Sequence, residues 1–204
     1  MILDTLQSLD ASALESFRSL VDQESAWQVR LIHLFADVEV FVTVLVLVGG
    51  WLRARFLLKN DPSAKDDVLA LFFAIVFAFG LYWLLNLGLP VRPRPETATT
   101  IPPLINHLPD NSFPSGHGIF AGASFLAAYF VYEKKTLAYA LLALGIPMLA
   151  ARVLAGVHYP GDVVVGFLLG ASFASIAVRW LAKPSVRKSP LFTVPKRIAS
   201  FVGL

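Results

Sequence analysis

The sequence predicts an all-helical membrane bundle of about five transmembrane spans, preceded by an amphipathic helix in the membrane interface. Of the 204 residues, 56% are hydrophobic and 15% are charged, and the mean hydropathy is +0.67. Soluble proteins average roughly 45–50% apolar and about 25% charged residues. Apolar stretches of the ~20 residues needed to cross a bilayer recur along the chain. The chain is therefore expected to be a polytopic membrane protein.

Charge and cysteine content exclude several other classes. The net charge of +3 is too small to indicate a nucleic-acid partner. The chain has no cysteine, which excludes a disulfide framework, a cysteine nucleophile and a thiolate metal site.

Residues 1–30 predict an amphipathic N-terminal helix. Leu14, Phe17, Leu20 and Val21 recur at helical spacing. Acidic residues outnumber basic ones in this segment, so the positively charged start of a signal peptide is missing. We expect this helix to lie along the membrane and to lead into the first span.

Residues 31–182 are expected to form the membrane bundle. Its five spans are predicted at 31–52, 68–89, 118–132, 136–157 and 163–181. Glycines four apart at Gly118 and Gly122, and at Gly166 and Gly170, either allow helix backbones to approach closely or are chance occurrences. Residues 183–204, with several prolines and basic residues, predict a poorly ordered basic tail beside the membrane.

The distribution of basic residues predicts the orientation of the bundle. Twelve of the 17 Lys and Arg residues fall in the first, third and fifth connections or tail. Basic residues favour the cytoplasmic side of a membrane. The tail is therefore expected in the cytoplasm, and the segments 90–115 and 157–162 are expected to face outward.

The outward segments concentrate groups that bind anions and transfer protons. Pro114-Ser115-Gly116-His117 precedes an apolar helix, so Ser115 is a candidate N-cap and Gly116 allows the backbone to approach a ligand. Free N–H groups and the helix dipole favour an anion such as phosphate at that end of a helix. His117 is placed there to give or take a proton.

A second outward segment carries Arg152, His158 and Asp162. In a helix, the four-residue step would make His158 and Asp162 neighbours. The carboxylate would then hold one ring nitrogen and leave the other free to attack, as in catalytic triads. The planar guanidinium groups of Arg92, Arg94 and Arg152 match phosphate oxygens.

These motifs resemble the three-part signature of the type-2 phosphatidic acid phosphatase superfamily, K-x6-R-P, P-S-G-H and S-R-x5-H-x3-D. Arg94-Pro95 matches the end of the first part, residues 114–117 match the second completely, and Arg152, His158 and Asp162 match the third. The similarity covers about residues 66–182. Two positions depart from it, because Leu87 stands at the lysine position and Ala151 at the serine position. We expect these departures to change the rate or the substrate preference.

The resemblance implies a mechanism and a set of roles. His158 would attack phosphorus and form a phosphohistidine, Asp162 would orient its ring, and His117 would protonate the leaving oxygen. Arg94 and Arg152, with Ser115, Gly116 and the His117 amide, would hold the phosphate, and Arg92 is a further candidate ligand. The family needs no metal or other cofactor, and the sequence contains no HExxH motif or carboxylate cluster at the proposed site.

The resemblance also implies a substrate class and a location. It is greatest to bacterial undecaprenyl-diphosphate phosphatases of the bacitracin-resistance type, in the cytoplasmic (inner) membrane with the site facing the periplasm or exterior. The implied partners are a lipid phosphate and membrane lipids. Phosphatidylglycerophosphate, phosphatidic acid and lipid A phosphatases share these residues. A lipid-phosphate transporter or flippase is the alternative from another class, and a catalytically silent relative is a third possibility.

Four other polar residues have less defined expectations. His33 and His107 are predicted to be structural. Asp37 and Glu39 in the first span either sit near the interface, pair within the bundle or serve substrate entry.

Overall fold

In the computed structural model, every regular element of the described residues, 2–58, 61–98, 102–107 and 111–201, is a helix. The elements in chain order are α1 (Ile2–Arg18), α2 (Ala26–Phe35), α3 (Val38–Phe56), α4 (Pro62–Gly88), α5 (Pro95–Ala98), α6 (Gly116–Val131), α7 (Thr136–Leu154), α8 (Pro160–Leu181), α9 (Pro184–Arg187) and α10 (Pro190–Phe201). The predicted all-helical class is confirmed.

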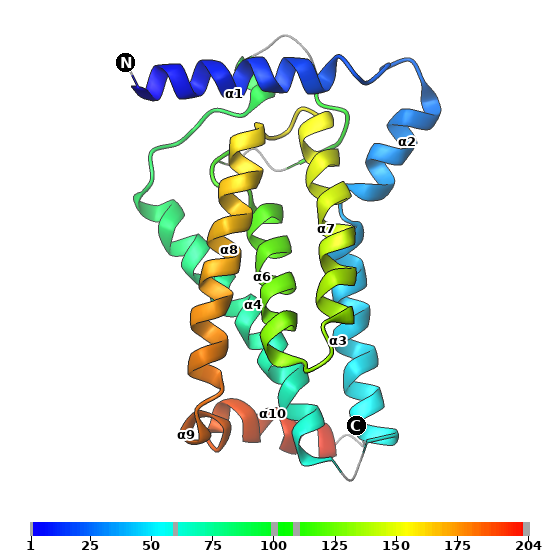
Figure 1. Ribbon diagram of the computed structural model, residues 1–204, viewed down its shortest axis with the longest axis vertical. Coiled ribbons are helices and arrows are strands. Elements are labelled where there is room, and N and C mark those ends of the chain that lie inside the picture. Colours follow the sequence, from blue (N-terminus) through cyan, green and yellow to red (C-terminus); the bar gives the residue numbers. More distant parts are fainter. Residues whose placement is uncertain (1, 59–60, 99–101, 108–110, 202–204) are drawn as a thin grey trace.

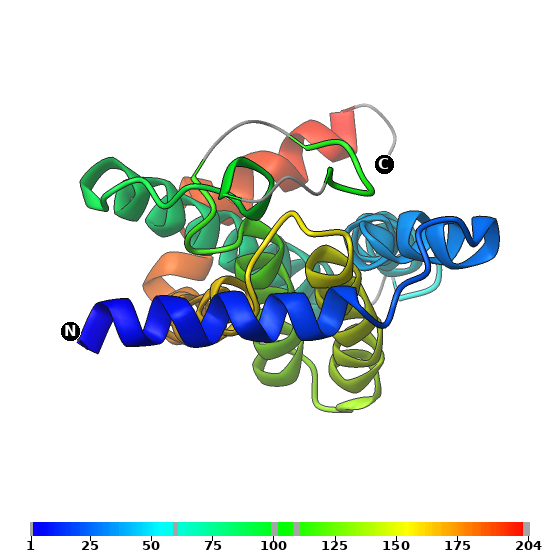
Figure 2. The same ribbon diagram turned by 90° about the horizontal axis from the view of Figure 1, so that it is seen from above.

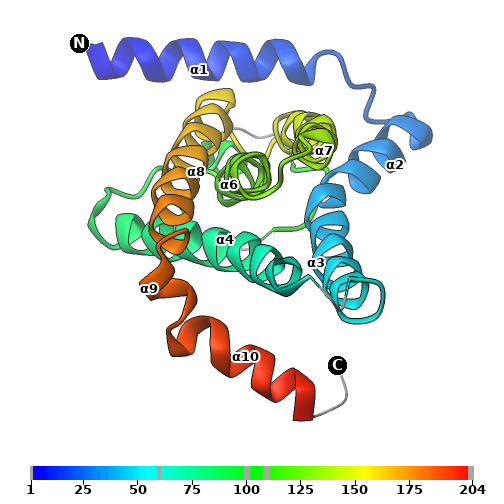
Figure 3. The same ribbon diagram turned by 60° about the horizontal axis from the view of Figure 1, so that its bottom comes forward.

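Helix α6 occupies the centre of the bundle, with α3, α4, α7 and α8 around it (Figure 3). Helix α1 runs across one end of the bundle, over α7 and α8 (Figures 1 and 2). Helices α9 and α10 lie at the opposite end (Figure 1). We call the end beneath α1 the outer end.

Among the described residues, four helical segments are long and apolar enough to cross a membrane, namely Ala26–Phe56, Ser63–Gly88, Thr136–Leu154 and Pro160–Leu181. The fifth predicted span is α6, an apolar helix of only 16 residues. At 1.5 Å per residue it is about 24 Å long, less than the ~30 Å hydrocarbon thickness. In Figure 1 its first turn lies below the outer ends of α7 and α8, so the residues at that turn are recessed within the bundle.

Glycines join α6 to α8 at backbone contact. A Cβ added to Gly122 would lie 2.0 Å from the carbonyl oxygen of Phe167, and one added to Gly170 would lie 2.1 Å from that of Ile119. Gly118 and Gly166 are similarly tight. Of the two readings of the glycine pairs, close helix approach is the one that the structure bears out.

Local signals explain where the helices begin. Asp61 caps α4 by accepting a hydrogen bond from the Ser63 amide at 2.9 Å, and Pro62 follows at the first helical position. Ser115 caps α6 by accepting from the Gly118 amide at 3.3 Å, which confirms its predicted capping role. Pro160 opens α8, and Asp162 lies in its first turn, where the helix dipole favours a carboxylate.

Both ends of the chain differ in detail from the sequence expectations. The N-terminal amphipathic helix ends at Arg18, and the first span already begins at Ala26. The expectation of a poorly ordered tail is wrong for its described part, which forms α9 and α10. Phe192 of α10 is fully buried and packs against Phe73 of α4, because an apolar residue on an amphipathic helix finds an apolar partner on the bundle.

Candidate active site

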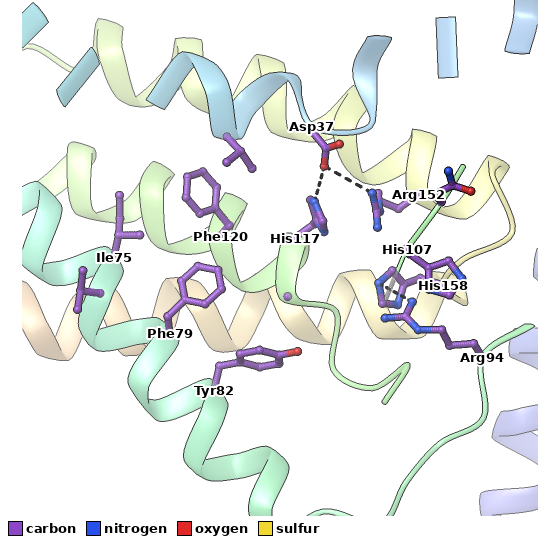
Figure 4. A pocket seen from close by; sticks show the side chains of 14 residues that line it. Asp37, Ile75, Phe79, Tyr82, Arg94, His107, His117, Phe120, Arg152 and His158 are labelled. Atoms are coloured by element: carbon purple, nitrogen blue, oxygen red, sulfur yellow. Dashed lines mark hydrogen bonds and ion pairs between the residues drawn. The ribbon is translucent and has the colours of Figure 1, made fainter. Parts of the chain in front are cut away.

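A cavity of about 670 Å³ opens at the outer part of the bundle and contains most of the residues singled out from the sequence. Figure 4 shows its side chains. One part is polar, with two arginines, three histidines and a carboxylate: Asp37, Arg94, His107, His117, Arg152 and His158. The other part is apolar, lined by Val40, Ile75, Val76, Phe79 and Phe120. The cavity is therefore amphiphilic.

His158 lies in the connection between α7 and α8 and is almost completely buried, with 2% of its surface exposed. Its Nδ1 donates a hydrogen bond to the backbone carbonyl of Ser112 at 2.9 Å. Its Nε2 lies 3.3 Å from Nη1 of Arg94. Burial lowers the pKa of His158 to about 4, and the nearby Arg94 acts in the same direction, whereas Asp162 opposes it. The ring is therefore neutral near pH 7, and its Nε2 lone pair faces the polar part of the cavity.

Asp162 lies beside a ring nitrogen of His158, as the sequence predicts, but at ion-pair distance rather than hydrogen-bond distance. His158 precedes α8, so the two residues are not one turn apart in a helix, and Nδ1 lies 3.6 Å from Oδ2. Instead, Oδ2 accepts hydrogen bonds from the Ser112 hydroxyl at 2.5 Å and from the Tyr159 amide at 2.9 Å. Asp162 therefore fixes the two segments that enclose the ring, and the Ser112 carbonyl makes the direct contact.

The two cavity arginines come from different elements. Arg94 precedes α5 and donates to the Val157 carbonyl at 2.7 Å, next to the nucleophile candidate. Arg152 lies in the last turn of α7, with 5% of its surface exposed. Both guanidinium groups line the cavity beside His158, where they provide positive charge for phosphate oxygens.

His117 in the first turn of α6 is more open, with 25% of its side chain exposed. Its Nε2 lies 2.7 Å from Oδ1 of Asp37, and the same oxygen lies 3.5 Å from Nη1 of Arg152 (Figure 4). Asp37 stands at the junction of α2 and α3. Of the expectations for Asp37, pairing within the bundle is the one that the structure bears out, since it pairs with His117 in the cavity wall, and a role in substrate entry stays a prediction.

Arg92 is not among the cavity residues. Its Nη1 donates to Oδ1 of Asp162 at 2.6 Å, and its Nη2 donates to Oδ2 of Asp10 at 2.8 Å. Both terminal nitrogens of Arg92 thus bind carboxylates outside the cavity that contains His158. The expectation that Arg92 contacts phosphate does not match this position. Ser115 is fully buried as the cap of α6, whereas Gly116 lines the cavity with its backbone.

Sequence reasoning missed the contributions of three residues in or beside the cavity, namely Glu96, His107 and Ser112. His107, expected to be structural, lines the cavity, and its Nε2 makes a short hydrogen bond to Oε2 of Glu96. Ser112 supplies both a hydroxyl and a carbonyl to the site. None of the three carries a spacing signal that links it to the motifs.

Glu39 lies apart from this site. It is fully buried in α3, where Oε1 accepts a short hydrogen bond from the Ser124 hydroxyl of α6. For Glu39, pairing within the bundle is the expectation that the structure bears out.

Within the described ranges, no group of three or more His, Asp or Glu side chains is arranged to hold a metal ion. The positive charge that the described cavity residues offer to a bound anion comes from Arg94 and Arg152.

Residues 67–185 match the model of the PAP2 superfamily. The chain is 35% identical over 147 residues to a lipid A 1-phosphatase of Rhizobium johnstonii, a match that covers 66% of this chain and 58% of that protein. It is 31% identical over 145 residues to the undecaprenyl-diphosphatase BcrC of Bacillus subtilis, covering 67% of this chain and 72% of the relative.

A solved structure has the same fold. It is a transmembrane PAP2-type phosphatidylglycerolphosphate phosphatase from Bacillus subtilis, with a TM-score of 0.60, 20% sequence identity and coverage of 86% of each chain. Asp10 and Asp37 both lie outside the segment that matches the family model.

Proposed function

The chain belongs to the PAP2 superfamily and is a membrane lipid phosphatase, and from this premise we propose that it hydrolyses undecaprenyl diphosphate to undecaprenyl phosphate and inorganic phosphate. The proposal includes a phosphohistidine intermediate on His158. It places the bundle in a bacterial cytoplasmic membrane, with the outer end toward the periplasm or exterior.

The observation that carries the proposal is the amphiphilic cavity. Its polar part offers Arg94 and Arg152 to phosphate oxygens, and the first turn of α6 presents the Gly116 backbone beside them. Its apolar part, with Val40, Phe79 and their neighbours, suits the first carbons of a lipid chain. A water-soluble phosphate ester would leave that apolar wall unused.

The first chemical step follows from the two histidines. Nε2 of His158 attacks the terminal phosphorus, a nitrogen–phosphorus bond forms, and the bond from phosphorus to the bridging oxygen breaks. His117 gives its proton to that oxygen, so that undecaprenyl phosphate leaves. The Ser112 carbonyl, which accepts from Nδ1 at 2.9 Å, stabilises the ring as it gains positive charge.

The second step restores the enzyme. Water attacks phosphorus in the phosphohistidine, His117 takes a proton from that water, and inorganic phosphate leaves Nε2 of His158. In both steps Arg94 and Arg152 stabilise the charge on the transferring phosphoryl group. Preorganised charge of this kind is usually the largest catalytic contribution.

The orientation rests on charge. Basic residues gather at the end opposite the cavity, on the segments around α9 and α10, on the last turns of α3 and α8 and in the connection between α6 and α7: Arg53, Arg55, Lys134, Lys135, Arg179, Lys183, Arg187, Lys188, Lys196 and Arg197. Basic residues favour the cytoplasmic side. This supports an outward-facing cavity, with α1 lying in the outer interface.

Two alternatives remain in view. Lipid A 1-phosphatase is the second candidate function, because the relative with that name is 35% identical to this chain. A lipid-phosphate transporter would use the cationic cavity for binding without turnover.

The test is phosphate release by the purified protein in detergent with EDTA present. Undecaprenyl diphosphate, lipid A, phosphatidylglycerophosphate and phosphatidic acid are offered separately, and His158→Ala is run in parallel. We expect the greatest kcat/KM with undecaprenyl diphosphate, and loss of at least about a thousandfold in the variant. A higher kcat/KM for lipid A would favour the second candidate, and binding without release in both proteins would favour the transporter.

A further inference from the structure

We propose that α1 is a working part of the active site, in which Asp10 and Arg18 are positioning residues that hold the connection carrying His158. The inference rests on the proposed function. It assigns a role to a helix that lies outside the segment matching the family model, residues 67–185.

The first contact runs from Asp10 through Arg92 to Asp162. Oδ2 of Asp10 accepts from Nη2 of Arg92 at 2.8 Å, and Nη1 of Arg92 donates to Oδ1 of Asp162 at 2.6 Å. The guanidinium carbon lies 4.1 Å from the centre of the Tyr159 ring, which holds the group from another side. The chain of charges is negative, positive and negative, and Asp162 at its inner end is fully buried.

Asp10 also holds the backbone directly. Its Oδ1 accepts from the Gly161 amide at 2.7 Å. A Cβ added to Gly161 would lie 2.8 Å from Oδ2 of Asp10, so the glycine is what lets the carboxylate approach. Both oxygens of one carboxylate on α1 are therefore used on the segment that follows His158.

Arg18 holds the other side of the same connection. Its Nη1 donates to the Ala155 carbonyl at 3.0 Å and its Nη2 to the Pro102 carbonyl at 3.2 Å. Gly156 has φ of +76°, and a Cβ there would lie 1.6 Å from Nη1 of Arg18. The glycine thus provides both the left-handed backbone and the space for the guanidinium group.

The two contacts act from one face of α1. Asp10 and Arg18 are eight residues apart, so they lie two turns apart on the same side of the helix. Leu14 between them is buried and packs with Val153, Tyr159 and Val163. The segment from residue 155 to residue 161 comprises the connection between α7 and α8 and the first two residues of α8. One helix, α1, therefore fixes this segment near both of its ends, with His158 between them.

This arrangement explains what the polar contacts contribute. A neutral nucleophile buried beside two arginines has to be aligned before the substrate arrives, and small misplacements of reacting groups reduce rates strongly. Replacing a partner that orients a metal ligand typically costs about 10- to 100-fold in affinity or activity, and we apply the same scale to the partners of His158. We place Asp10 at the lower end of that range, because it acts on His158 through Arg92, Asp162 and the backbone.

The experiment compares Asp10→Asn, Asp10→Glu and the control Glu15→Gln in the full-length protein reconstituted in lipid vesicles. Glu15 is an exposed acid on the same helix. We expect Asp10→Asn to lower kcat about tenfold with KM changed by less than about twofold. Asp10→Glu should recover part of the loss, and Glu15→Gln should match the wild-type protein.

A double-mutant cycle with Arg92→Gln tests the coupling. If Asp10 acts through Arg92, then Asp10→Asn should lower kcat only slightly in a protein that already carries Arg92→Gln. If the two losses multiply instead, or if Asp10→Asn behaves like Glu15→Gln, the positioning role is wrong.

A measurement without turnover separates this inference from the proposed function. Orthovanadate takes the five-coordinate geometry of phosphoryl transfer, so it should raise the melting temperature of the wild-type protein more than that of Asp10→Asn. If no lipid is hydrolysed but this difference persists, the proposed function fails and the positioning role stands. An equal vanadate shift in the two proteins would overturn the role of Asp10.

Discussion

The two histidines of the cavity are held in opposite ways. His158 is 2% exposed, and its surroundings are fixed by Ser112, Asp162 and Arg94. His117 has a side chain that is 25% exposed, and the side chain of its partner Asp37 is itself 51% exposed. The nucleophile side of the site is thus buried and fully engaged, whereas the acid side is open.

This difference fits the two roles in the proposed mechanism. A nucleophile benefits from a fixed approach to phosphorus, which the buried side provides before substrate binds. A general acid has to reach a leaving oxygen whose position depends on the lipid, and it later has to reach a water molecule. We infer that the rigidity of one side and the openness of the other are both needed.

The strongest test of the comparison is replacement of His117 by glutamine. Loss of a general acid typically costs 10²- to 10⁴-fold, so His117→Gln should slow the single-turnover release of diacylglycerol from phosphatidic acid, whose leaving alkoxide has to be protonated, by about that factor. An aryl phosphate has an acidic leaving group that needs little protonation, so its single-turnover release of the phenol should fall much less. An equal loss in this first step for both substrates would contradict the acid role.

The next largest effect is expected from replacing Gly122, at the contact between α6 and α8. One of these helices carries His117, and the other directly follows the connection that carries His158. Gly122→Ala places a methyl group against the Phe167 carbonyl, where a Cβ would lie only 2.0 Å away. We expect a loss of about 3 kcal/mol in the free energy of unfolding and loss of activity on both sides of the site.

Gly80→Ala is the matched control for that variant. A Cβ at Gly80 of α4 meets nothing within 4 Å, so its melting temperature should stay within a few degrees of the wild-type value. Thermal unfolding in detergent measures both. A tolerated Gly122→Ala would mean that the helices separate easily, and that the two sides are not joined rigidly.

Asp37→Asn should have a smaller effect and sharpen the contrast. The carboxylate accepts from His117 and lies near Arg152, so its loss releases the acid while the nucleophile side stays intact. We expect kcat to fall about tenfold, which corresponds to about 1.4 kcal/mol. Steady-state kinetics with Asp61→Asn, at the far end of the bundle, as control measures it. An unchanged kcat would show that Asp37 does not position His117.

The smallest effect concerns mild acid. Because burial lowers the pKa of His158 to about 4, the ring stays neutral well below pH 6.5. The value of kcat/KM, which reports the free enzyme, should therefore fall by less than about twofold between pH 7 and pH 5.5 through His158, and half of it should be lost near pH 4. A nucleophile with an ordinary histidine pKa of about 6.5 would lose about tenfold by pH 5.5. That outcome would mean that His158 is not buried as described.

The sequence predicts the parts of the site that are local in the chain. Ser115 as a cap and His117 in the first helical turn depend on neighbours within a few residues, so capping rules suffice. The spacing of Arg152, His158 and Asp162 is likewise contained in one short stretch of chain, from the last turn of α7 to the first turn of α8. These predictions were possible because local sequence determines how helices begin.

The partners of these residues were not predictable from one sequence. Asp10 meets Arg92 across 82 residues of chain, and Asp37 meets His117 across 80. Such contacts depend on how the helices pack, and no spacing rule connects them. For the same reason the direct acceptor of His158 is a backbone carbonyl, at Ser112, rather than the expected carboxylate.

The apolar wall of the cavity has a consequence for how the rate depends on concentration. Val40 of α3, Phe79 of α4 and Phe120 of α6 form that wall, while α1 crosses the outer end of the bundle. A lipid substrate that meets this wall stays in the bilayer during the reaction, and only phosphate has to leave for water. The concentration that matters is then two-dimensional. At a fixed bulk amount of substrate, added inert lipid should slow the reaction by surface dilution, so that KM is properly a mole fraction of the membrane.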